Sequence, residues 1–261
     1  FGFVWLQNQD SPRDVILGTT DDSLGDPSTI TVAAARSNAT DPAIVWTGSE
    51  WLVAWREHMT AGECENEGAC DRHLMVARIG ADGTVLAEAA PLWTDIEALS
   101  RPSLTLASDG IWITIVARPD EAARVVVEKL SLTGSSAGPP TDLFTDITAR
   151  EQAPATTLYG NRLVVVASTL AGLTAAILEA DSPTIDVGPV TIDDDSASST
   201  PDVDTNGTMI GVAYVGADPG GTTGRIATLD LDGELLAQAP PLQITPSNTT
   251  PRSPAIRSIS T

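Results

Sequence analysis

The residues with the most evident chemical potential lie close together in one segment, EHMTAGECENEGACDRH at positions 57–73. It holds both cysteines of the chain, Cys64 and Cys70, and both histidines, His58 and His73. Thiolate and imidazole are preferred zinc ligands, but the spacing H-x5-C-x5-C-x2-H matches no familiar zinc finger. We therefore predict a disulfide between the two cysteines that pins a long loop, with a zinc site or free thiols as the alternatives.

The same loop is strongly acidic. Loops on a rigid scaffold often carry binding residues, and this charge favours a cationic partner or a divalent ion over an anion. A solvated surface loop explains the charge equally well, because a run of like charges specifies little. The candidate binding residues in this loop are Glu63, Glu65, Glu67, Asp71 and His73.

Three further acidic groups could supply oxygen ligands for calcium. They are positions 193–195, the pair Asp202 and Asp204, and the pair Asp230 and Asp232. None of them matches the calcium-binding loop with its distal glutamate, and ordinary turn chemistry explains the Asp-Gly pairs. We therefore expect no cofactor, with calcium and zinc left as alternatives.

The sequence shows no activated nucleophile. It contains neither a G-x-S-x-G elbow nor a phosphate-binding loop, and both histidines flank the cysteine loop. Paired carboxylates for glycoside hydrolysis stay open as an alternative, because acidic residues are abundant. Asp202 and Asp204 fall on one expected inner strand, and Asp41 stands just before another.

Composition narrows the classes of partner. The chain of 261 residues carries 35 acidic and 14 basic residues, a net charge of −21. Such a surface repels nucleic acid and anionic lipid, so no nucleic-acid partner is expected. No run approaches 18 apolar residues, so no transmembrane segment is expected. Phe1 is expected to be a processed start, as after removal of a signal peptide.

A repeat of about 50 residues organises the chain. Each copy begins with a proline and a short apolar strand, followed by a tight turn, a strongly apolar second strand, a variable loop, and two more strands around another turn. The prolines are Pro42, Pro102, Pro154, Pro201 and Pro254. Turns such as Asn206-Gly207 and Ser108-Asp109-Gly110 are tight-hairpin signals, because their residues accept positive φ.

The second strands lack strict alternation, which indicates burial on both faces between neighbouring sheets. Trp5, Trp55 and Trp112 fall in such strands and are expected in the core rather than in a sugar-stacking surface.

The repeat predicts an all-β fold: a five-bladed β-propeller with four antiparallel strands per blade, whose last blade is closed by both termini. A pair of β-sandwiches is the alternative. We expect one domain, 1–261, with blades at about 42–100, 101–151, 152–199, 200–251, and 252–261 plus 1–41.

The string PAIVWTGSEWLVAW, followed by LMVARIGADGTVL, resembles a propeller-blade repeat common in large secreted or surface proteins of bacteria. The match is good over 42–90, partial over 102–135 and 201–236, and weak over 154–192. The resemblance implies an extracellular or cell-surface location and a binding or scaffolding role, with no catalytic residues to transfer. The ring size also resembles five-bladed lectins and glycosidases, by architecture alone.

From these observations we expect a non-catalytic binding or scaffolding module of a secreted or cell-surface protein. A carbohydrate-active propeller, either lectin or glycosidase, is the alternative. The ligand would be a protein or a glycan, and the chain a monomer or part of a larger assembly. In a propeller, the loops between second and third strands share a face with the inter-blade residues, here Asp41, Arg101 and Arg252, which are expected around the channel mouth.

Overall fold

The computed structural model describes residues 1–8, 12–20, 28–36, 38–58, 72–119, 122–136, 138–145, 147–179, 181–218, 221–230, 232 and 234–238. These residues form strands and turns and contain no helix, so the fold is all-β, as predicted. Accordingly, the described ranges hold no helix of the length and hydropathy needed to cross a membrane.

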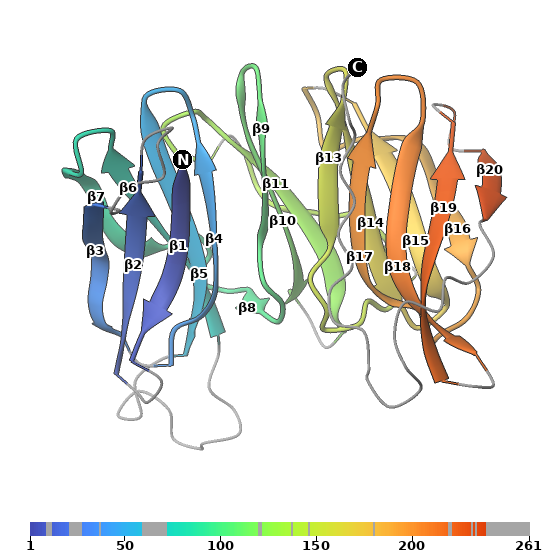
Figure 1. The fold of residues 1–261 in the computed structure, drawn as a ribbon, viewed down its shortest axis with the longest axis horizontal. Coiled ribbons are helices and arrows are strands. Elements are labelled where there is room, and N and C mark those ends of the chain that lie inside the picture. The colour runs from blue at the N-terminus through green and yellow to red at the C-terminus, as the bar shows by residue number, and fades with distance from the viewer. Residues whose placement is uncertain are drawn as a thin grey trace.

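The described strands form five separate antiparallel sheets, numbered I to V along the chain (Figure 1). Sheet I contains β1 (Gly2–Gln7), β2 (Arg13–Thr19) and β3 (Ser28–Arg36). Sheet II contains β4 (Thr40–Trp46), β5 (Glu50–His58), β6 (Arg72–Gly80) and β7 (Val85–Pro91). Sheet III contains β8 (Glu97–Ala98), β9 (Ser103–Ala107), β10 (Gly110–Arg118), β11 (Arg124–Leu130) and β12 (Thr141–Asp142). Sheet IV contains β13 (Ala155–Tyr159), β14 (Arg162–Thr169), β15 (Gly172–Leu178) and β16 (Ile185–Asp193). Sheet V contains β17 (Ser199–Thr205), β18 (Ile210–Asp218), β19 (Gly221–Leu229) and β20 (Leu235–Gln238).

The first hairpin of sheets II to V forms where the repeat predicts it. β4, β9, β13 and β17 each pair with the strand that follows them in the chain. The turns contain Gly48, Gly160 and Gly207 at φ values of 99°, 60° and 88°. Glycine adopts such values with the least strain, because it has no Cβ, and this favours it in these short turns.

The strand count of sheet III corrects the prediction of four strands in every blade. The additional strand β8 pairs with the end of β10, so this sheet has five strands. Its strand β12 is only two residues long. Pro139 and Pro140 immediately precede β12, and proline has no N–H with which to extend a ladder. Sheet I has three strands among the described residues, and the strand expected to begin at Pro254 lies outside them.

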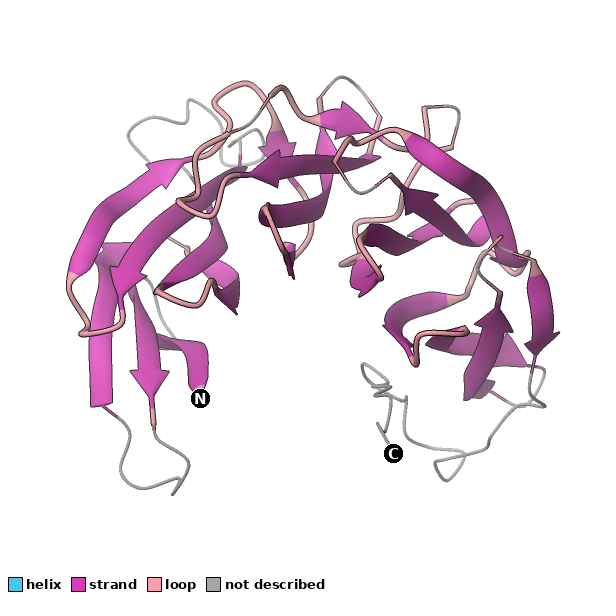
Figure 2. Ribbon diagram, turned by 90° about the horizontal axis from the view of Figure 1, so that it is seen from above, coloured by secondary structure: helices cyan, strands magenta, loops and turns pink. Residues whose placement is uncertain are grey.

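The five sheets stand side by side along an arc around a central hollow (Figure 2). Their chain order is also their spatial order, since β1 contacts β4, β4 contacts β9, β9 contacts β13, and β13 contacts β17. This is a propeller-type arrangement with the first strand of each of sheets II to V innermost. In the part of the chain described, the arc is open between sheets V and I.

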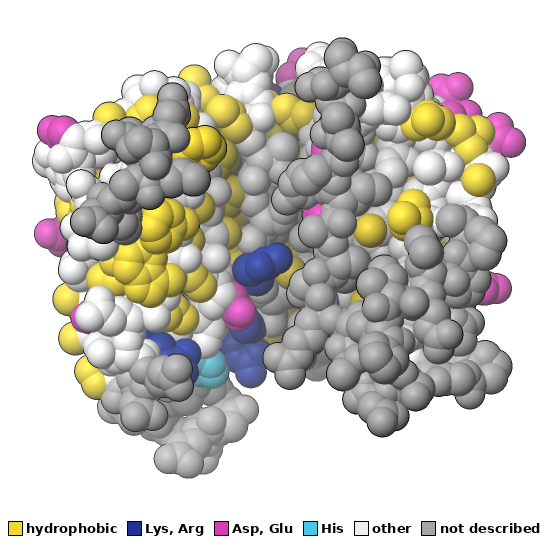
Figure 3. Space-filling model, in the orientation of Figure 1, with side chains coloured by type: hydrophobic (Ala, Val, Ile, Leu, Met, Phe, Trp, Pro, Cys, Tyr) yellow, Lys and Arg dark blue, Asp and Glu magenta, His cyan; other side chains and the backbone are white. Residues whose placement is uncertain are grey.

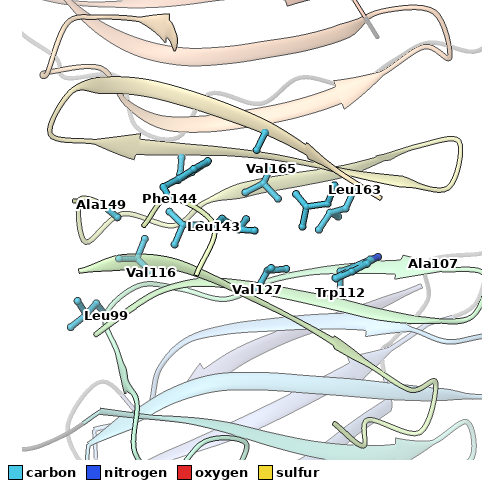
Figure 4. Close-up of a cluster of buried hydrophobic side chains, with 14 residues drawn as sticks. Leu99, Ala107, Trp112, Val116, Val127, Leu143, Phe144, Ala149, Leu163 and Val165 are labelled. Atoms are coloured by element: carbon cyan, nitrogen blue, oxygen red, sulfur yellow. The ribbon is translucent and has the colours of Figure 1, made fainter. Parts of the chain in front are cut away.

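Apolar clusters fill the four seams between consecutive sheets. The seam between sheets III and IV contains Trp112 and Val127 on one side and Leu163 and Val165 on the other, with Phe144 from the connecting segment (Figure 4). All but the last residue of β10 are buried, as the lack of alternation predicts.

Of the three tryptophans expected in the core, Trp55 and Trp112 are fully buried. Trp5 is half-buried and stacks on Phe3, with ring centroids 5.3 Å apart.

Three of these seams also contain a buried carboxylate, which we call a seam carboxylate. Glu57 of sheet II accepts a hydrogen bond from Arg36 of sheet I, with 2.9 Å between Nε and Oε2. Glu128 of sheet III accepts one from the indole N–H of Trp93, in the segment that follows sheet II. Asp193 of sheet IV lies 2.8 Å from Nη1 of Arg225 in sheet V. A buried charge needs such a partner, so these contacts fix which surfaces meet. Asp193 and Arg225 together link sheets IV and V.

Candidate functional site

A cavity of about 520 Å³ opens along the inner strands β9, β13 and β17, on the side of the central hollow. Sheets III, IV and V therefore each contribute part of its wall. Most of the lining side chains are small or polar. The described lining residues are Arg101, Ser103, Leu104, Ala153, Pro154, Ala155, Thr156, Thr157, Thr200, Pro201, Asp202, Val203 and Asp204.

The repeat explains why these residues meet. The residue before the repeat proline lines the cavity in each of the three sheets: Arg101, Ala153 and Thr200. Proline donates no ladder hydrogen bond and restricts the backbone of the residue before it. The pairing of each inner strand is therefore irregular where the strand begins, beside the central hollow. Thr200 has φ of 46°, uncommon for a β-branched residue, and its hydroxyl is buried without a hydrogen-bond partner among the described residues. Such strain is characteristic of functional sites.

A row of hydroxyl groups joins the walls formed by sheets III and IV. The hydroxyl oxygen of Thr156 on β13 lies 2.6 Å from that of Ser103 and 2.6 Å from that of Thr105, both on β9. A hydroxyl both donates and accepts hydrogen bonds. Ser103 and Thr156 line the cavity together with Thr157, so this wall can bind the hydroxyl groups of a ligand.

Two carboxylates stand on the same face of β17. Asp202 and Asp204 pair in regular register with Ala213 and Gly211 of β18, while Val203 between them packs into the seam between sheets IV and V. Alternation along the strand therefore directs both aspartates away from that seam, with their Cα atoms about 6.7 Å apart. Two carboxyl groups about 5–10 Å apart can flank one glycosidic bond, and this Cα spacing allows such a separation. Asp204 also accepts a hydrogen bond from the backbone N–H of Thr205, and both aspartates take part in further interactions within the chain.

Arg101 is the basic group of the cavity. Its side chain is exposed, and no other described residue forms a hydrogen bond or an ion pair with its guanidinium group. Every other described arginine, and Lys129, has at least one such partner.

A network of charged residues connects sheets II and III. Arg56 on β5 donates a hydrogen bond from Nε to Oδ2 of Asp41, at 3.0 Å, and another to the backbone carbonyl of Leu99. Arg118 on β10 pairs with Glu97 of β8. The space-filling view shows arginine or lysine side chains gathered in the hollow, with an acidic side chain and a histidine beside them (Figure 3).

His58 lies beside this network, and its pKa is lowered from the ordinary value of 6.5. Partial burial is the largest cause, followed by the positive charges of Arg72 and Arg56, while the negative charge of Glu97 opposes the shift. Glu151 extends the network toward sheet IV, since its carboxylate lies 3.4 Å from Arg118 and 3.9 Å from Arg72. The lowered pKa favours the neutral form of the His58 imidazole.

The structure places three of the residues predicted to bind a partner or to form the disulfide. Arg101 lines the cavity, Asp41 is paired with Arg56, and Nδ1 of His73 lies 3.5 Å from the backbone carbonyl of Trp93. The remaining ones lie outside the described residues, so the disulfide and the loop site stay predictions: Cys64, Cys70, Glu63, Glu65, Glu67, Asp71 and Arg252.

The other acidic groups considered for calcium have local roles. Asp193 is a seam carboxylate, Asp195 accepts a hydrogen bond from the N–H of Ala197, and Asp230 accepts two from the N–H groups of Asp232 and Glu234. These are turn contacts. Within the described ranges, no three His, Cys, Asp or Glu residues are grouped as metal ligands would be.

No protein-family model and no curated protein sequence matches this chain. Solved structures do match. A putative glycosidase from Bacteroides thetaiotaomicron aligns over 81% of this chain and 74% of its own, with a TM-score of 0.51 and 12% identity. A putative glycoside hydrolase from Parabacteroides distasonis covers 84% and 77%, with a TM-score of 0.49 and 13% identity. The catalytic domain of an α-L-arabinofuranosidase from Coprinopsis cinerea covers 77% and 68%, with a TM-score of 0.48 and 12% identity.

The likeness is one of fold. The expectation of a non-catalytic binding or scaffolding module is contradicted, because one solved structure that shares the fold, with a TM-score of 0.51, is that of a putative glycosidase. The carbohydrate-active alternative agrees with this finding. The sequence favoured a non-catalytic module because it shows no serine or cysteine nucleophile beside a base, and hydrolysis by paired carboxylates needs no such nucleophile.

Proposed function

We propose that this chain is a carbohydrate-active protein of the glycoside hydrolase type, and that the cavity between sheets III, IV and V is its sugar site. The observation that carries the proposal is the same-face pair Asp202 and Asp204 in a polar cavity of about 520 Å³. The volume suits a small ligand. The fold shared with a putative glycosidase supports the same proposal.

Two carboxyl groups are sufficient for glycoside hydrolysis. One, in its acid form, donates a proton to the glycosidic oxygen as the bond from that oxygen to the anomeric carbon breaks. The other, as carboxylate, removes a proton from the water that attacks the anomeric carbon, or forms a covalent intermediate that water then hydrolyses. We assign this pair of roles to Asp202 and Asp204. The hydroxyl row of Ser103 and Thr156 would hold the sugar through its hydroxyl groups.

The test is turnover of a panel of aryl glycosides and oligosaccharides by the wild type and by Asp202→Asn and Asp204→Asn. We expect each substitution to lower kcat by about 10²- to 10⁴-fold, the usual contribution of a general acid or base. Asp186→Asn is the matched control, because Asp186 forms an exposed ion pair with Arg162. Hydrolysis that survives in both variants, or a panel with no substrate at all, would contradict the assignment. Binding without turnover would identify a lectin instead.

We also propose that the ring has five blades and that residues 252–261 complete sheet I beside β1. Three observations support this. Among the described strands, β1 pairs only with β2. Phe3 on β1, at the open end of the arc, is 42% exposed. Joining the two ends of the chain also preserves the repeat period. An extracellular or cell-surface location is proposed from the blade resemblance and the net charge of −21.

A further inference from the structure

We infer that the saccharide bound in this cavity carries a carboxylate, as in a hexuronic acid, and that Arg101 binds it. The inference rests on the proposed function and names its substrate class. The guanidinium of Arg101 is exposed and without a partner among the described residues, and Arg101 lines the cavity.

Arg101 differs from the other described basic side chains, because each of those has a hydrogen-bond or ion-pair partner. The chain has 35 acidic residues for 14 basic ones, so counter-charges are plentiful, and each of the other described basic side chains has a partner. A guanidinium presents a planar fork of donors that matches a carboxylate in two parallel hydrogen bonds. Arg101 offers that fork to a ligand, whereas Arg56 and Arg78 already hold carboxylates of the chain.

The order of the sheets gives the two ends of the cavity different charges. Arg101 precedes β9 in sheet III, the aspartates stand on β17 in sheet V, and β13 of sheet IV lies between them. A ligand that spans the cavity meets a cation at one end, the hydroxyl of Thr156 in the middle, and the carboxyl pair at the other end. An oligosaccharide with a carboxylate at one end and the cleaved bond at the other matches this sequence of groups.

The same oxyanion chemistry could come from free phosphate. Two features favour the sugar carboxylate. Asp202 and Asp204 line the same cavity and repel a small multiply charged anion more strongly than a single carboxylate on a neutral sugar. The hydroxyl row between Ser103 and Thr156 offers both donors and acceptors to sugar hydroxyls, while phosphate at neutral pH mainly needs donors.

The experiment compares matched oligosaccharides by calorimetry on the full chain. One set ends in glucuronic or galacturonic acid, the other in glucose or galactose, and inorganic phosphate is titrated separately. We expect the wild type to bind the acidic member about 10- to 100-fold more tightly than its neutral match, as charge-assisted hydrogen bonds usually give. Arg101→Gln should abolish this preference, and Arg101→Lys should keep part of it because the charge remains. Arg162→Gln is the control, because its partner Asp186 is on the surface outside the cavity lining.

Each outcome decides the matter. Neutral sugars bound or hydrolysed as well as acidic ones would overturn the inference and leave the proposed function standing. An acidic preference that persists in Arg101→Gln would also overturn it. Phosphate bound through Arg101, without preference for uronic acids, would assign the residue to a different anion. If no saccharide of either set binds, the inference and the proposed function both fail.

Discussion

Asp193→Asn should weaken the seam between sheets IV and V more than its small change in shape suggests. The Asp193 side chain is 7% exposed and accepts hydrogen bonds from the Ser198 hydroxyl, at 3.0 Å, and from Arg225, at 2.8 Å. Asparagine has almost the same shape but no charge. It would therefore leave the guanidinium of Arg225, which is 18% exposed, without its counter-charge. Breaking a buried pair in this way costs about 3–5 kcal/mol. Because Arg225 keeps some contact with water, we expect the free energy of unfolding to fall by about 3 kcal/mol, the lower end of this range.

The assay is denaturant unfolding followed by tryptophan fluorescence, with thermal unfolding in parallel. A loss of about 3 kcal/mol corresponds to a Tm lower by about 6–12 °C for a chain of this size. Asp186→Asn is the control, because its ion pair with Arg162 is exposed and such pairs contribute at most about 1 kcal/mol. A loss in Asp193→Asn no larger than in the control would refute the reasoning.

The same variant has a defined pH signature. Burial by itself raises the pKa of Asp193, but hydrogen bonds from the Asp195 N–H and the hydroxyls of Ser198 and Tyr214, with the charge of Arg225, outweigh it and hold the pKa below the ordinary value of 3.8. A carboxyl whose pKa is lower in the folded state stabilises the fold above its unfolded pKa, near 4, and this contribution is lost as pH falls through the folded pKa. The stability difference between wild type and Asp193→Asn should therefore be full at pH 7 and shrink below about pH 4.

Two further predictions concern the backbone and the ends of the chain. Gly172→Ala should cost more than about 3 kcal/mol, because φ is 120° and a Cβ there would overlap the backbone carbonyl of Asp193, whereas Gly207→Ala, at φ of 88° with open space around it, should cost about 1–2 kcal/mol. Thermal unfolding of the two variants side by side checks the difference. Equal losses of stability would show that the positive φ alone, and not the overlap with Asp193, sets the cost of substitution. Deleting residues 252–261 should lower the Tm if these residues close the ring, and an unchanged Tm would contradict five-blade closure.

Local signals in the sequence account for the parts of the fold that could be predicted. Glycines at positive φ mark the hairpins at Gly48, Gly160 and Gly207, and these turns need no distant contact to form. The strands β10 and β14 could be assigned because burial on both faces removes alternation.

The irregular parts of the core could not be predicted in the same way. Leu143 and Phe144 are buried in the seam between sheets III and IV, yet they lie in a segment without regular period. Their burial depends on the neighbouring sheet. Strand β8 is two residues long, too short to leave any alternation pattern in the sequence.

The candidate site also contains residues that could be predicted from the sequence and residues that could not. Asp202 and Asp204 could be placed on an inner strand from the repeat alone. The hydroxyls of Ser103, Thr156 and Thr200 could not be predicted as site residues, because serine and threonine are common and have no distinctive spacing in this sequence. The available signal was positional: in three consecutive sheets, a polar residue of the cavity lining lies within two positions of the repeat proline. Which of these positions share one cavity depends on how the sheets curve around the hollow, and that is a property of the assembled fold.

Because each seam joins only consecutive sheets, opening fluctuations should follow the order of the sheets. Among the described residues, sheets II, III and IV have a seam on both sides, while sheets I and V have one each. Cooperative units linked in this way can open from an end without disturbing the middle. Amide protons of β10 and β14 should therefore exchange most slowly, and those of β1 and β19 much sooner in a chain lacking residues 252–261. Closing the ring would abolish the ends, so that a local opening anywhere would have to break two seams at once.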